Sequence, residues 1–328
     1  MKKTIALLYG GASKEHDVSV MGHKYILNLL ANTEYNAVPV YINRDGEWLL
    51  NGEDVFPRFR SCGGELATDY GACIKIDAAI PLLHGDGGES GEIQGLLSSA
   101  KIPFIGADAS TGALCLDKHY TKCIAKNLGI PTVDWVCFKK NCPKDTALSL
   151  CKERLGFPLF LKPRRLGSSI GAFPARNEKE FEAHYSEALE ISNGLLMAEK
   201  LVTNKRELEC AFYSAFGKTV ISPPGEILTD GFYGYDEKYI NSAKTSSRAD
   251  IDSITENDIV KYSSLLGEAC ELRHLGRIDY FLTEDGLFFN EINTFPGFTD
   301  KSLYPKMLYE IGITPKDAIL SFIEDALC

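Results

Sequence analysis

The sequence predicts a protein that combines α/β and α+β architecture in two or three domains. Its 328 residues exceed what a single typical hydrophobic core encloses. Up to about residue 115, strand-like and helix-like segments alternate, which is typical of a parallel sheet covered by helices. Near the C-terminus two strand-like segments follow each other across a short connection, which indicates an antiparallel hairpin.

Bulk properties argue against several classes of protein. A net charge of −10 argues against a general nucleic-acid binder, because such affinity rests on clustered cations. No apolar run is long enough to cross a bilayer, and the start "MKKTIALLYGG" lacks a signal-peptide cleavage pattern. None of the ten cysteines forms a CxxC pair or repeats at a metal-finger spacing. We therefore expect reduced thiols, no zinc site and a cytoplasmic protein without nucleic-acid or membrane partners.

The first segment is expected to form a sheet whose strands end at glycine-rich turns. Strands are predicted at residues 3–10, 37–42, 78–85 and 102–106, and helices at residues 18–30 and from about Gly91. Ligands of such sheets bind beyond the carboxyl ends of the strands. The turns "GGASKEHDVS" and "HGDGGESGE" lie at those ends, which makes them a candidate binding region.

The second segment contains a loop suited to phosphate. A helix is predicted from Asp117, its N-cap, to Gly129, its C-cap, and a second helix ends at Gly156. The strand "FPLFLKP" leads into "RRLGSSIG", where glycines let the backbone approach a ligand and hydroxyls can face phosphate oxygens. Lys162 at the strand end supplies a point charge, and Lys118 at the helix start is a second candidate. Each lysine by itself is weak evidence, because an isolated lysine is usually a solvated surface charge.

Two further stretches have more than one interpretation. "LLMAEKLV" ends a strand with Glu199 and Lys200, where backbone groups could face a nucleotide base. The pattern by itself favours an edge strand with ordinary charges. The third segment begins near Lys205, and its irregular stretch at residues 229–250 is typical of a functional lid or a disordered segment.

The C-terminal hairpin carries polar side chains on its strands. The strands "RIDYFL" and "FFNEINTFPGFT" flank a loop that we take as the three residues "EDG", with glycine in the left-handed position. This loop makes Thr283 face Leu287. Counting outward then puts Asp279 opposite Glu291 on one face of the sheet. A two-residue loop would instead put these two acids on opposite faces.

The same register places Arg277 opposite Asn293, on the face that holds both acids. Two carboxylates that face each other across paired strands are destabilising unless a cation lies between them. Two carboxylates and an amide oxygen suit Mg²⁺, which is usually held by few protein groups together with substrate phosphates. A solvated face on which Lys or Arg neighbours screen the acids fits the pattern equally well.

Six motifs, in one order along nearly the whole chain, resemble those of the D-alanine–D-alanine ligase family of ATP-grasp ligases. "GGASKEHDVS" resembles the family pattern GGxSxExxVS, and "LHGDGGESGEIQG" resembles HGxxGEDGxxQG. "CLDKHYTK" is similar to the start of the family's central domain, and "KPRRLGSSIG" to KPxxxGSSxG. "YDEKY" is similar to the lid motif, and "GRID" with "NEINTFPGFT" to the metal-binding strands.

The resemblance implies a three-domain ATP-grasp ligase. Its parts would be an N-terminal α/β substrate domain at residues 1–115, a central domain at 116–207, and a C-terminal catalytic domain at 208–328 with a lid near 229–250. ATP would lie between the last two domains with two Mg²⁺ or Mn²⁺ ions. The family further implies a cytoplasmic homodimer that uses D-alanine and ATP to make a peptidoglycan precursor.

The resemblance also assigns residues to the nucleotide and metal sites. The metal ligands would be Asp279, Glu291 and Asn293. The phosphates would be contacted by Lys118, Lys162, Ser168 and Lys238. Adenine and ribose would be surrounded by Glu199, Lys200, Val202 and Glu207. Before Glu207, "TNKRE" departs from the family's shorter, glycine-containing link, so this glutamate could be displaced by a position or two.

The implied reaction phosphorylates the carboxylate of one D-alanine and then forms a peptide bond with the amine of a second. Arg277 and the backbone N–H of Gly297 would stabilise the oxyanion. Glu15 would hold the first substrate's ammonium group and His84 its carboxylate. Without the motif, His84 is better explained as a structural histidine and Glu15 as a cap of the following helix.

The lid and the second substrate complete the implied site. Ser168 and Tyr239 would link Glu15 to the closed lid and exclude water, although Tyr239 by itself could simply pack. Ser302 and Leu303 would receive the carboxylate of the second substrate.

Three alternatives to D-alanine ligation stay open. Relatives that make D-alanyl-D-serine often carry Arg where this chain has Leu303. Relatives that make D-alanyl-D-lactate typically lack the lid pair present here as Lys238 and Tyr239. Both features favour D-alanine as the second substrate, with D-serine next, although Asp300 and Lys301 replace the Ser-His often found in the family. The alternative from another class is a non-catalytic nucleotide-binding protein.

Overall fold

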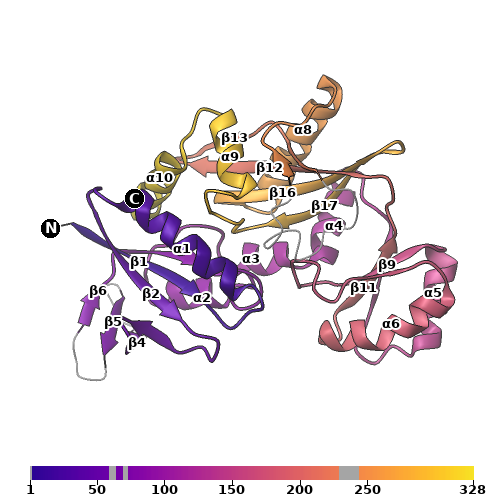
Figure 1. The fold of residues 1–328 in the computed structure, drawn as a ribbon, viewed down its shortest axis with the longest axis horizontal. Helices are drawn as coiled ribbons and strands as arrows, with labels where there is room; N and C mark the ends of the chain where they lie inside the picture. Colours follow the sequence, from indigo (N-terminus) through magenta and orange to yellow (C-terminus); the bar gives the residue numbers. More distant parts are fainter. Residues whose placement is uncertain (1, 59–63, 69–72, 229–243) are drawn as a thin grey trace.

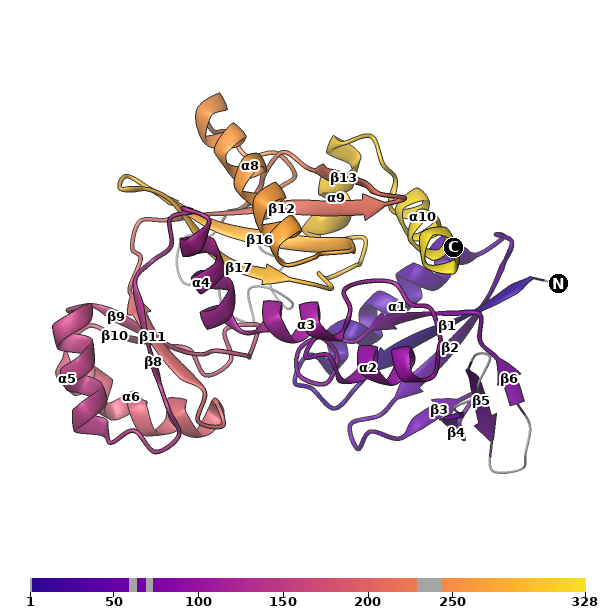
Figure 2. The same cartoon turned by 180° about the vertical axis from the view of Figure 1, so that it is seen from behind.

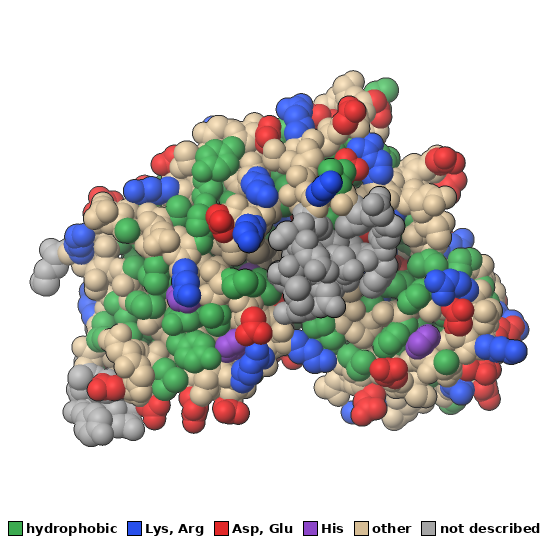
Figure 3. All heavy atoms as spheres, in the orientation of Figure 1, with side chains coloured by type: hydrophobic (Ala, Val, Ile, Leu, Met, Phe, Trp, Pro, Cys, Tyr) green, Lys and Arg blue, Asp and Glu red, His purple; other side chains and the backbone are tan. Residues whose placement is uncertain are grey.

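The computed structural model describes residues 2–58, 64–68, 73–228 and 244–328. The strands form three sheets, and Figures 1 and 2 show one in the indigo N-terminal lobe, one in the rose lobe and one in the orange and yellow lobe. Across these residues, none of the helices combines the length and apolar character that crossing a membrane requires. Acidic and basic side chains are interspersed over the face seen in Figure 3.

The first sheet has the strand order β6-β5-β4-β3-β2-β1-β7. Its strands are β1 (Lys3–Gly10), β2 (Tyr35–Ile42), β3 (Trp48–Leu50), β4 (Glu53–Arg58), β5 (Glu65–Thr68), β6 (Cys73–Lys75) and β7 (Ala78–Leu82). β1 pairs in parallel with β2 and β7, which confirms the predicted parallel sheet. The pairs from β2 through to β6 are antiparallel and extend the sheet beyond the prediction.

Helices cover both faces of this sheet. They are α1 (His16–Leu30) and α2 (Glu92–Ser99). Ile5 and Leu7 of β1 pack in the cluster that includes α1, whereas Ala6 and Leu8 pack in the cluster that includes α2. Alternate residues of a strand point to opposite faces, so the middle of β1, from Ile5 to Leu8, is apolar because both of its faces are buried.

The predicted strand at residues 102–106 is wrong. In this segment only Phe104 pairs with the sheet, as a single parallel bridge to Ala79. Pro103 has no N–H to donate, and Gly106 turns the chain with a φ of +100°, so pairing cannot extend in either direction.

The second sheet has the order β10-β9-β11-β8 and is antiparallel. Its strands are β8 (Trp135–Phe138), β9 (Leu159–Pro163), β10 (Phe173–Ala175) and β11 (Leu196–Lys200). The helices of this part are α3 (Ala109–Leu116), α4 (Lys118–Asn127), α5 (Lys144–Arg154) and α6 (Glu178–Ile191), and Figure 1 shows α5 and α6 on one side of the sheet. As predicted, Asp117 caps α4 by accepting from the N–H of His119, and Gly129 follows the helix with a φ of +74°. The interpretation of 196–200 as an edge strand is wrong, because β11 pairs with a neighbour on both sides.

The third sheet has the order β15-β14-β12-β16-β17, and β13 also pairs with β12. Its strands are β12 (Arg206–Ala215), β13 (Lys218–Ile221), β14 (Gly225–Leu228), β15 (Lys244–Ser246), β16 (His274–Thr283) and β17 (Gly286–Asn293). The helices are α8 (Ser253–Ala269), α9 (Leu303–Glu310) and α10 (Pro315–Leu327). Leu208 and Cys210 of β12 pack in the cluster that includes α8, whereas Ala211 and Tyr213 share a cluster with α9, α10 and the first sheet. One hydrophobic core therefore joins the first and third sheets.

The turn of the C-terminal hairpin differs from the prediction. Thr283 pairs with Gly286, so the loop consists of the two residues Glu284 and Asp285 rather than three. A two-residue loop by itself would place Asp279 and Glu291 on opposite faces of the sheet.

A β-bulge corrects this shift before the strands reach the site. Tyr280 pairs with Phe289, but the next pair is Asp279 with Glu291, so Asn290 is an extra residue on β17. The predicted pairing of Asp279 with Glu291, and that of Arg277 with Asn293, is therefore confirmed although the predicted turn is wrong.

Candidate active site

Two cavities have volumes of about 730 and about 680 Å³. Residues from all three parts of the chain line the first, and residues from the second and third parts line the second. Every predicted site residue within the described ranges lines at least one of them. The first is lined by Glu15, His84, Arg277, Asn293, Gly297, Ser302 and Leu303. The second is lined by Lys162, Glu199, Lys200, Val202, Glu207 and Asp279. Lys118, Ser168 and Glu291 line both, so the two cavities meet there. The predicted lid residues Lys238 and Tyr239 lie outside the described residues.

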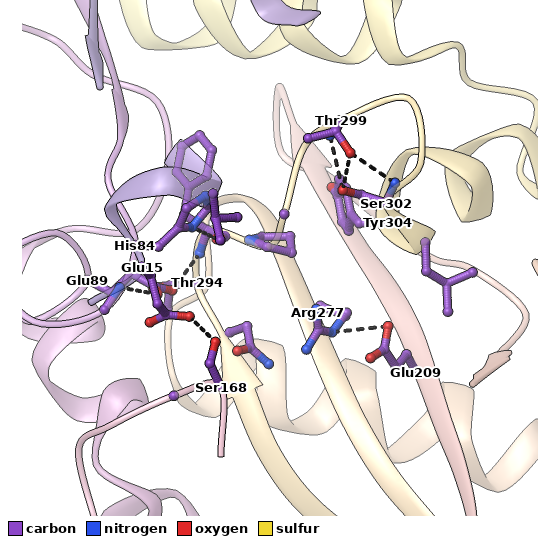
Figure 4. A pocket seen from close by; sticks show the side chains of 18 of the residues that line it. Glu15, His84, Glu89, Ser168, Glu209, Arg277, Thr294, Thr299, Ser302 and Tyr304 are labelled. Atoms are coloured by element: carbon purple, nitrogen blue, oxygen red, sulfur yellow. Dashed lines mark hydrogen bonds and ion pairs between the residues drawn. The ribbon is translucent and has the colours of Figure 1, made fainter. Parts of the chain in front are cut away.

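Glu15 and Ser168 connect the first sheet to the glycine-serine loop (Figure 4). Ser168 Oγ donates a hydrogen bond to Glu15 Oε1. Glu15 is the N-cap residue of α1, but its side chain makes no capping hydrogen bond. A Cβ atom added to Gly85 would lie 2.6 Å from Glu15 Oε2. The glycine is therefore needed for this carboxylate to occupy its position.

His84 and Glu89 join the loop after β7 to the loop after β17. His84 Nδ1 lies 3.1 Å from the carbonyl oxygen of Phe295, and this oxygen can only accept, so Nδ1 carries a proton. His84 therefore also has a structural role, because it joins these two loops. The buried Glu89 accepts hydrogen bonds from the N–H groups of Gly85 and Phe295, both at 3.0 Å, and from Thr294 Oγ1. Burial is the main cause that raises the pKa of Glu89.

The N-terminus of a helix forms one wall of the first cavity. Ser302 and Leu303 stand at the N-terminus of α9, where the helix dipole favours an anion. The hydroxyl of Ser302 lies 2.8 Å from Thr299 Oγ1, as Figure 4 shows, and accepts from the N–H of Thr299 at 3.1 Å. These contacts hold the chain around Gly297 and Ser302 in one conformation.

The acids of the third sheet are paired with cations. Arg277 donates two hydrogen bonds of 2.8 Å to Asp279 and forms an ion pair of 3.2 Å with Glu209 of the neighbouring strand β12. Lys118 Nζ lies 3.0 Å from Glu291 Oε2. The cationic neighbours of the second interpretation are thus present, but the face is not solvated, since Asp279 is only 8% exposed. The metal interpretation stays a prediction.

These residues also fit a divalent metal. Asn293 Nδ2 lies 3.0 Å from Asp279 Oδ2, and Asp279 pairs with Glu291 across the strands, so two carboxylates and an amide share one wall. Over the described parts of the chain, no three His, Cys, Asp or Glu side chains form a metal-binding group. The metal prediction therefore rests on two acids, the amide of Asn293 and the oxygen atoms of a phosphate ligand.

The second cavity is built around a buried lysine and glutamate. Lys162 Nζ lies 2.5 Å from Glu199 Oε1 and donates to Asn290 Oδ1 at 3.3 Å. Burial is the main cause that lowers the pKa of Lys162 to about 8. Neighbouring lysines lower this pKa further, whereas Glu199 opposes the shift. The ammonium group of Lys200 lies 3.9 Å from Asp134 in a mostly exposed pair, so its side chain contributes less to this site.

Sequence reasoning missed several residues that position the site. Asp117 was expected only to cap a helix, but it also binds the guanidinium groups of Arg164, at 2.7 and 3.0 Å, and of Arg165, at 2.9 Å. This contact ties the helix that carries Lys118 to the loop that carries Ser168. Two adjacent arginines before the loop were the available sequence signal, together with an acid that begins a helix.

The two antiparallel sheets that face each other across a lysine-lined cavity define an ATP-grasp fold. The chain belongs to the D-alanine–D-alanine ligase family: the model described as D-ala D-ala ligase N-terminus matches residues 4–107, and that described as D-ala D-ala ligase C-terminus matches residues 124–324.

Individual relatives match over nearly their whole length. The chain is 34% identical to a D-alanine–D-alanine ligase of Proteus mirabilis, with 99% of this chain and 95% of that protein covered. Among solved structures, D-alanyl-alanine synthetase A from Vibrio cholerae matches with a TM-score of 0.90 at 33% identity, covering 100% of this chain and 99% of that one. The VanG D-Ala:D-Ser ligase from Enterococcus faecalis matches with a TM-score of 0.88 at 30% identity, covering 99% and 100%.

We predict that Asp117→Asn lowers the free energy of unfolding by about 3 kcal/mol at pH 7, because it leaves buried arginine contacts without their counter-charge. Burial raises the pKa of Asp117, but Arg164 and Arg165 outweigh this and hold it below its usual value. A lowered carboxyl pKa stabilises the fold above the unfolded value of about 4, and this contribution is lost as the pH falls further. Urea unfolding at several pH values should therefore show the difference between wild type and variant shrinking below about pH 4.

The matched control is Asp108→Asn. Asp108 caps α3 by accepting from Thr111, but its carboxylate is exposed. Asparagine caps a helix about as well as aspartate, so this variant should change stability by less than about 0.5 kcal/mol. Equal losses in the two variants would contradict the assigned role of Asp117.

Proposed function

We propose that this chain is an ATP-dependent ligase that joins two D-alanine molecules into a dipeptide for peptidoglycan synthesis. The observation that carries the proposal is the meeting of the two cavities at Lys118, Ser168 and Glu291. A nucleotide whose base lies near Glu199 can thus present its terminal phosphate to a carboxylate in the first cavity. Membership of the family supports the same activity.

In the proposed first step, Glu15 holds the ammonium group of one D-alanine, and His84 and Arg277 hold its carboxylate. A carboxylate oxygen attacks the terminal phosphorus of ATP, and ADP leaves, so that an acyl phosphate forms. Negative charge shifts among phosphoryl oxygens in this step, and the fixed charges of Lys118 and Lys162 stabilise it. Asp279, Glu291 and Asn293 would hold two Mg²⁺ or Mn²⁺ ions, which neutralise charge on the phosphates.

In the proposed second step, the N-terminus of α9 at Ser302 and Leu303 holds the carboxylate of the second D-alanine. Its free amine attacks the acyl carbon, phosphate leaves, and the amine gives up a proton. The tetrahedral oxyanion lies within reach of Arg277 and the N–H of Gly297. Glu209 and Asp279 keep the guanidinium group oriented from two strands.

Other parts of the proposal rest on the resemblance alone. These are the three domains at residues 1–115, 116–207 and 208–328, the roles of Lys238 and Tyr239 in a lid near 229–250, and a cytoplasmic homodimer. The likeness to the VanG ligase favours D-serine as the next candidate for the second substrate. Leu303 is apolar and almost buried, with 7% exposure, so it offers no side-chain donor to a serine hydroxyl.

The test of the function is a competition. Purified protein with ATP and Mg²⁺ is given D-alanine together with equal amounts of D-serine and D-lactate, and the products are separated by mass spectrometry. We expect phosphate release that depends on D-alanine and not L-alanine, with D-alanyl-D-alanine as the main product. A main product of D-alanyl-D-serine would support the alternative, and absence of D-alanine-dependent phosphate release would leave a nucleotide-binding protein.

We predict that Glu291→Ala lowers kcat at least about 100-fold, because it removes a carboxylate that would hold the metal ions at the ATP phosphates. Glu284→Ala, in the exposed turn of the same hairpin, should leave kcat within about twofold of wild type. Both rates are measured by phosphate release with saturating substrates. Near-normal turnover of Glu291→Ala at ordinary Mg²⁺ would rule out its assignment as a metal ligand.

A further inference from the structure

Lys122 in the second turn of α4 is a lysine whose side chain is entirely buried, with 0% of the residue exposed. It belongs to the motif "CLDKHYTK", of which the proposed function uses only Lys118. Neither cavity is lined by Lys122. Burying an ammonium group costs several kcal/mol unless it is paired, so this charge requires an explanation.

The partners of Lys122 connect it to the nucleotide cavity. Its Nζ lies 3.1 Å from Glu199 Oε2 and donates to the carbonyl oxygen of Val133 at 3.2 Å. The other oxygen of Glu199, Oε1, binds Lys162, which lines the cavity. Lys122 therefore lies behind Glu199, whereas Glu199 and Lys162 both line the nucleotide cavity.

This arrangement contains two positive charges and one negative charge. With Lys162 as its sole partner, Glu199 would form a neutral pair, and the pull of Lys162 on a phosphate would be largely cancelled. Lys122 compensates Glu199 from behind, so the trio keeps a net positive charge facing the cavity. The contact between Lys122 Nζ and Glu199 Oε2 is an ion pair of 3.1 Å.

The titration of the group agrees with this geometry. Burial raises the pKa of Glu199, but Lys122 and then Lys162 outweigh burial and bring it to about 2, so the carboxylate stays ionised. The pKa of Lys162 is lowered to about 8, by burial first and by Lys122 among the nearby charges. The positive charge of Lys122, which lowers the pKa of Lys162, would also attract an anion in the cavity.

We propose that Lys122 is a positioning residue of the nucleotide site. Its positive charge balances the negative charge of Glu199. Glu199 can then orient Lys162 without cancelling the attraction of Lys162 for a phosphate. The inference rests on the proposed function, since it assumes that the second cavity takes a nucleotide. Lys122 acts through Glu199 and does not touch the ligand. A purely structural role, in which Lys122 only holds the carbonyl of Val133, is the competing explanation.

Two substitutions of Lys122 and one matched control separate these roles. Lys122→Met keeps the length of the side chain and removes its charge. Lys122→Gln also removes the charge but can still donate a hydrogen bond to Val133. The control is Lys126→Met, because Lys126 lies one turn further along α4 and near the same Trp135 ring, at 6.0 Å against 5.5 Å, but is exposed.

The measurement is the affinity for a non-hydrolysable ATP analogue with Mg²⁺, obtained by calorimetry from pH 7 to 9.5. It requires no turnover, and urea unfolding of each variant checks its fold. For the wild type we expect affinity to fall as the pH rises through about 8, because Lys162 loses its proton there. In Lys122→Met and Lys122→Gln we expect affinity at pH 7 to fall about tenfold, and the midpoint of the high-pH loss to move upward. Lys126→Met should match the wild type in both quantities.

Each other outcome contradicts the inference. Wild-type affinity in both Lys122 variants, or a loss of affinity without any movement of the pH midpoint, would assign Lys122 a structural role. Normal behaviour of Lys122→Gln beside a defective or unfolded Lys122→Met would show that the hydrogen bond matters and the charge does not. Failure of the wild type to bind the analogue would refute the proposed function itself. If the wild type binds the analogue and the variants bind it equally well, only the inference about Lys122 fails.

Discussion

The pairing of β16 with β17 is the constraint on which the rest of the site depends. It places Asp279 opposite Glu291 and Arg277 opposite Asn293, so acids, a guanidinium group and an amide share one face. Both acids are held by cations from other positions, Asp279 by Arg277 and Glu291 by Lys118. Lys118 belongs to a helix that packs against β17, so the charge pairs also fix how the middle segment meets the third sheet.

The same principle applies to other charge pairs near the two cavities. A buried ion pair gains little stability by itself, because removing two charges from water costs about as much as their attraction returns. Fixed charges are nevertheless what a phosphoryl transfer needs, since they do not have to reorganise when charge develops in the transition state. The pairs of Asp117 with Arg164 and of Glu199 with Lys162 are therefore better explained by orientation of the site than by folding stability.

Sequence reasoning located this face of the sheet, but one step of the argument failed. The loop between β16 and β17 has two residues, and the bulge at Asn290 restores the register that a three-residue loop was expected to produce. Neither the turn type nor the bulge follows from the local pattern, because both depend on how the strands pack. Most residues that line the cavities were found because their motifs resemble those of the family. Buried supports such as Glu89, Glu209 and Lys122 were missed, because single charged residues within a strand, loop or helix resemble surface charges.

The central claim is that the walls formed by these paired charges bind a nucleotide together with divalent metal. Its most direct test is electron paramagnetic resonance of Mn²⁺ titrated into the protein with a non-hydrolysable ATP analogue, compared with the analogue alone and with Asp279→Asn. The account predicts two Mn²⁺ ions per chain in an environment distinct from the free Mn²⁺ nucleotide, and weaker binding in Asp279→Asn. A Mn²⁺ spectrum identical to that of the nucleotide alone, with no dependence on Asp279, would contradict it.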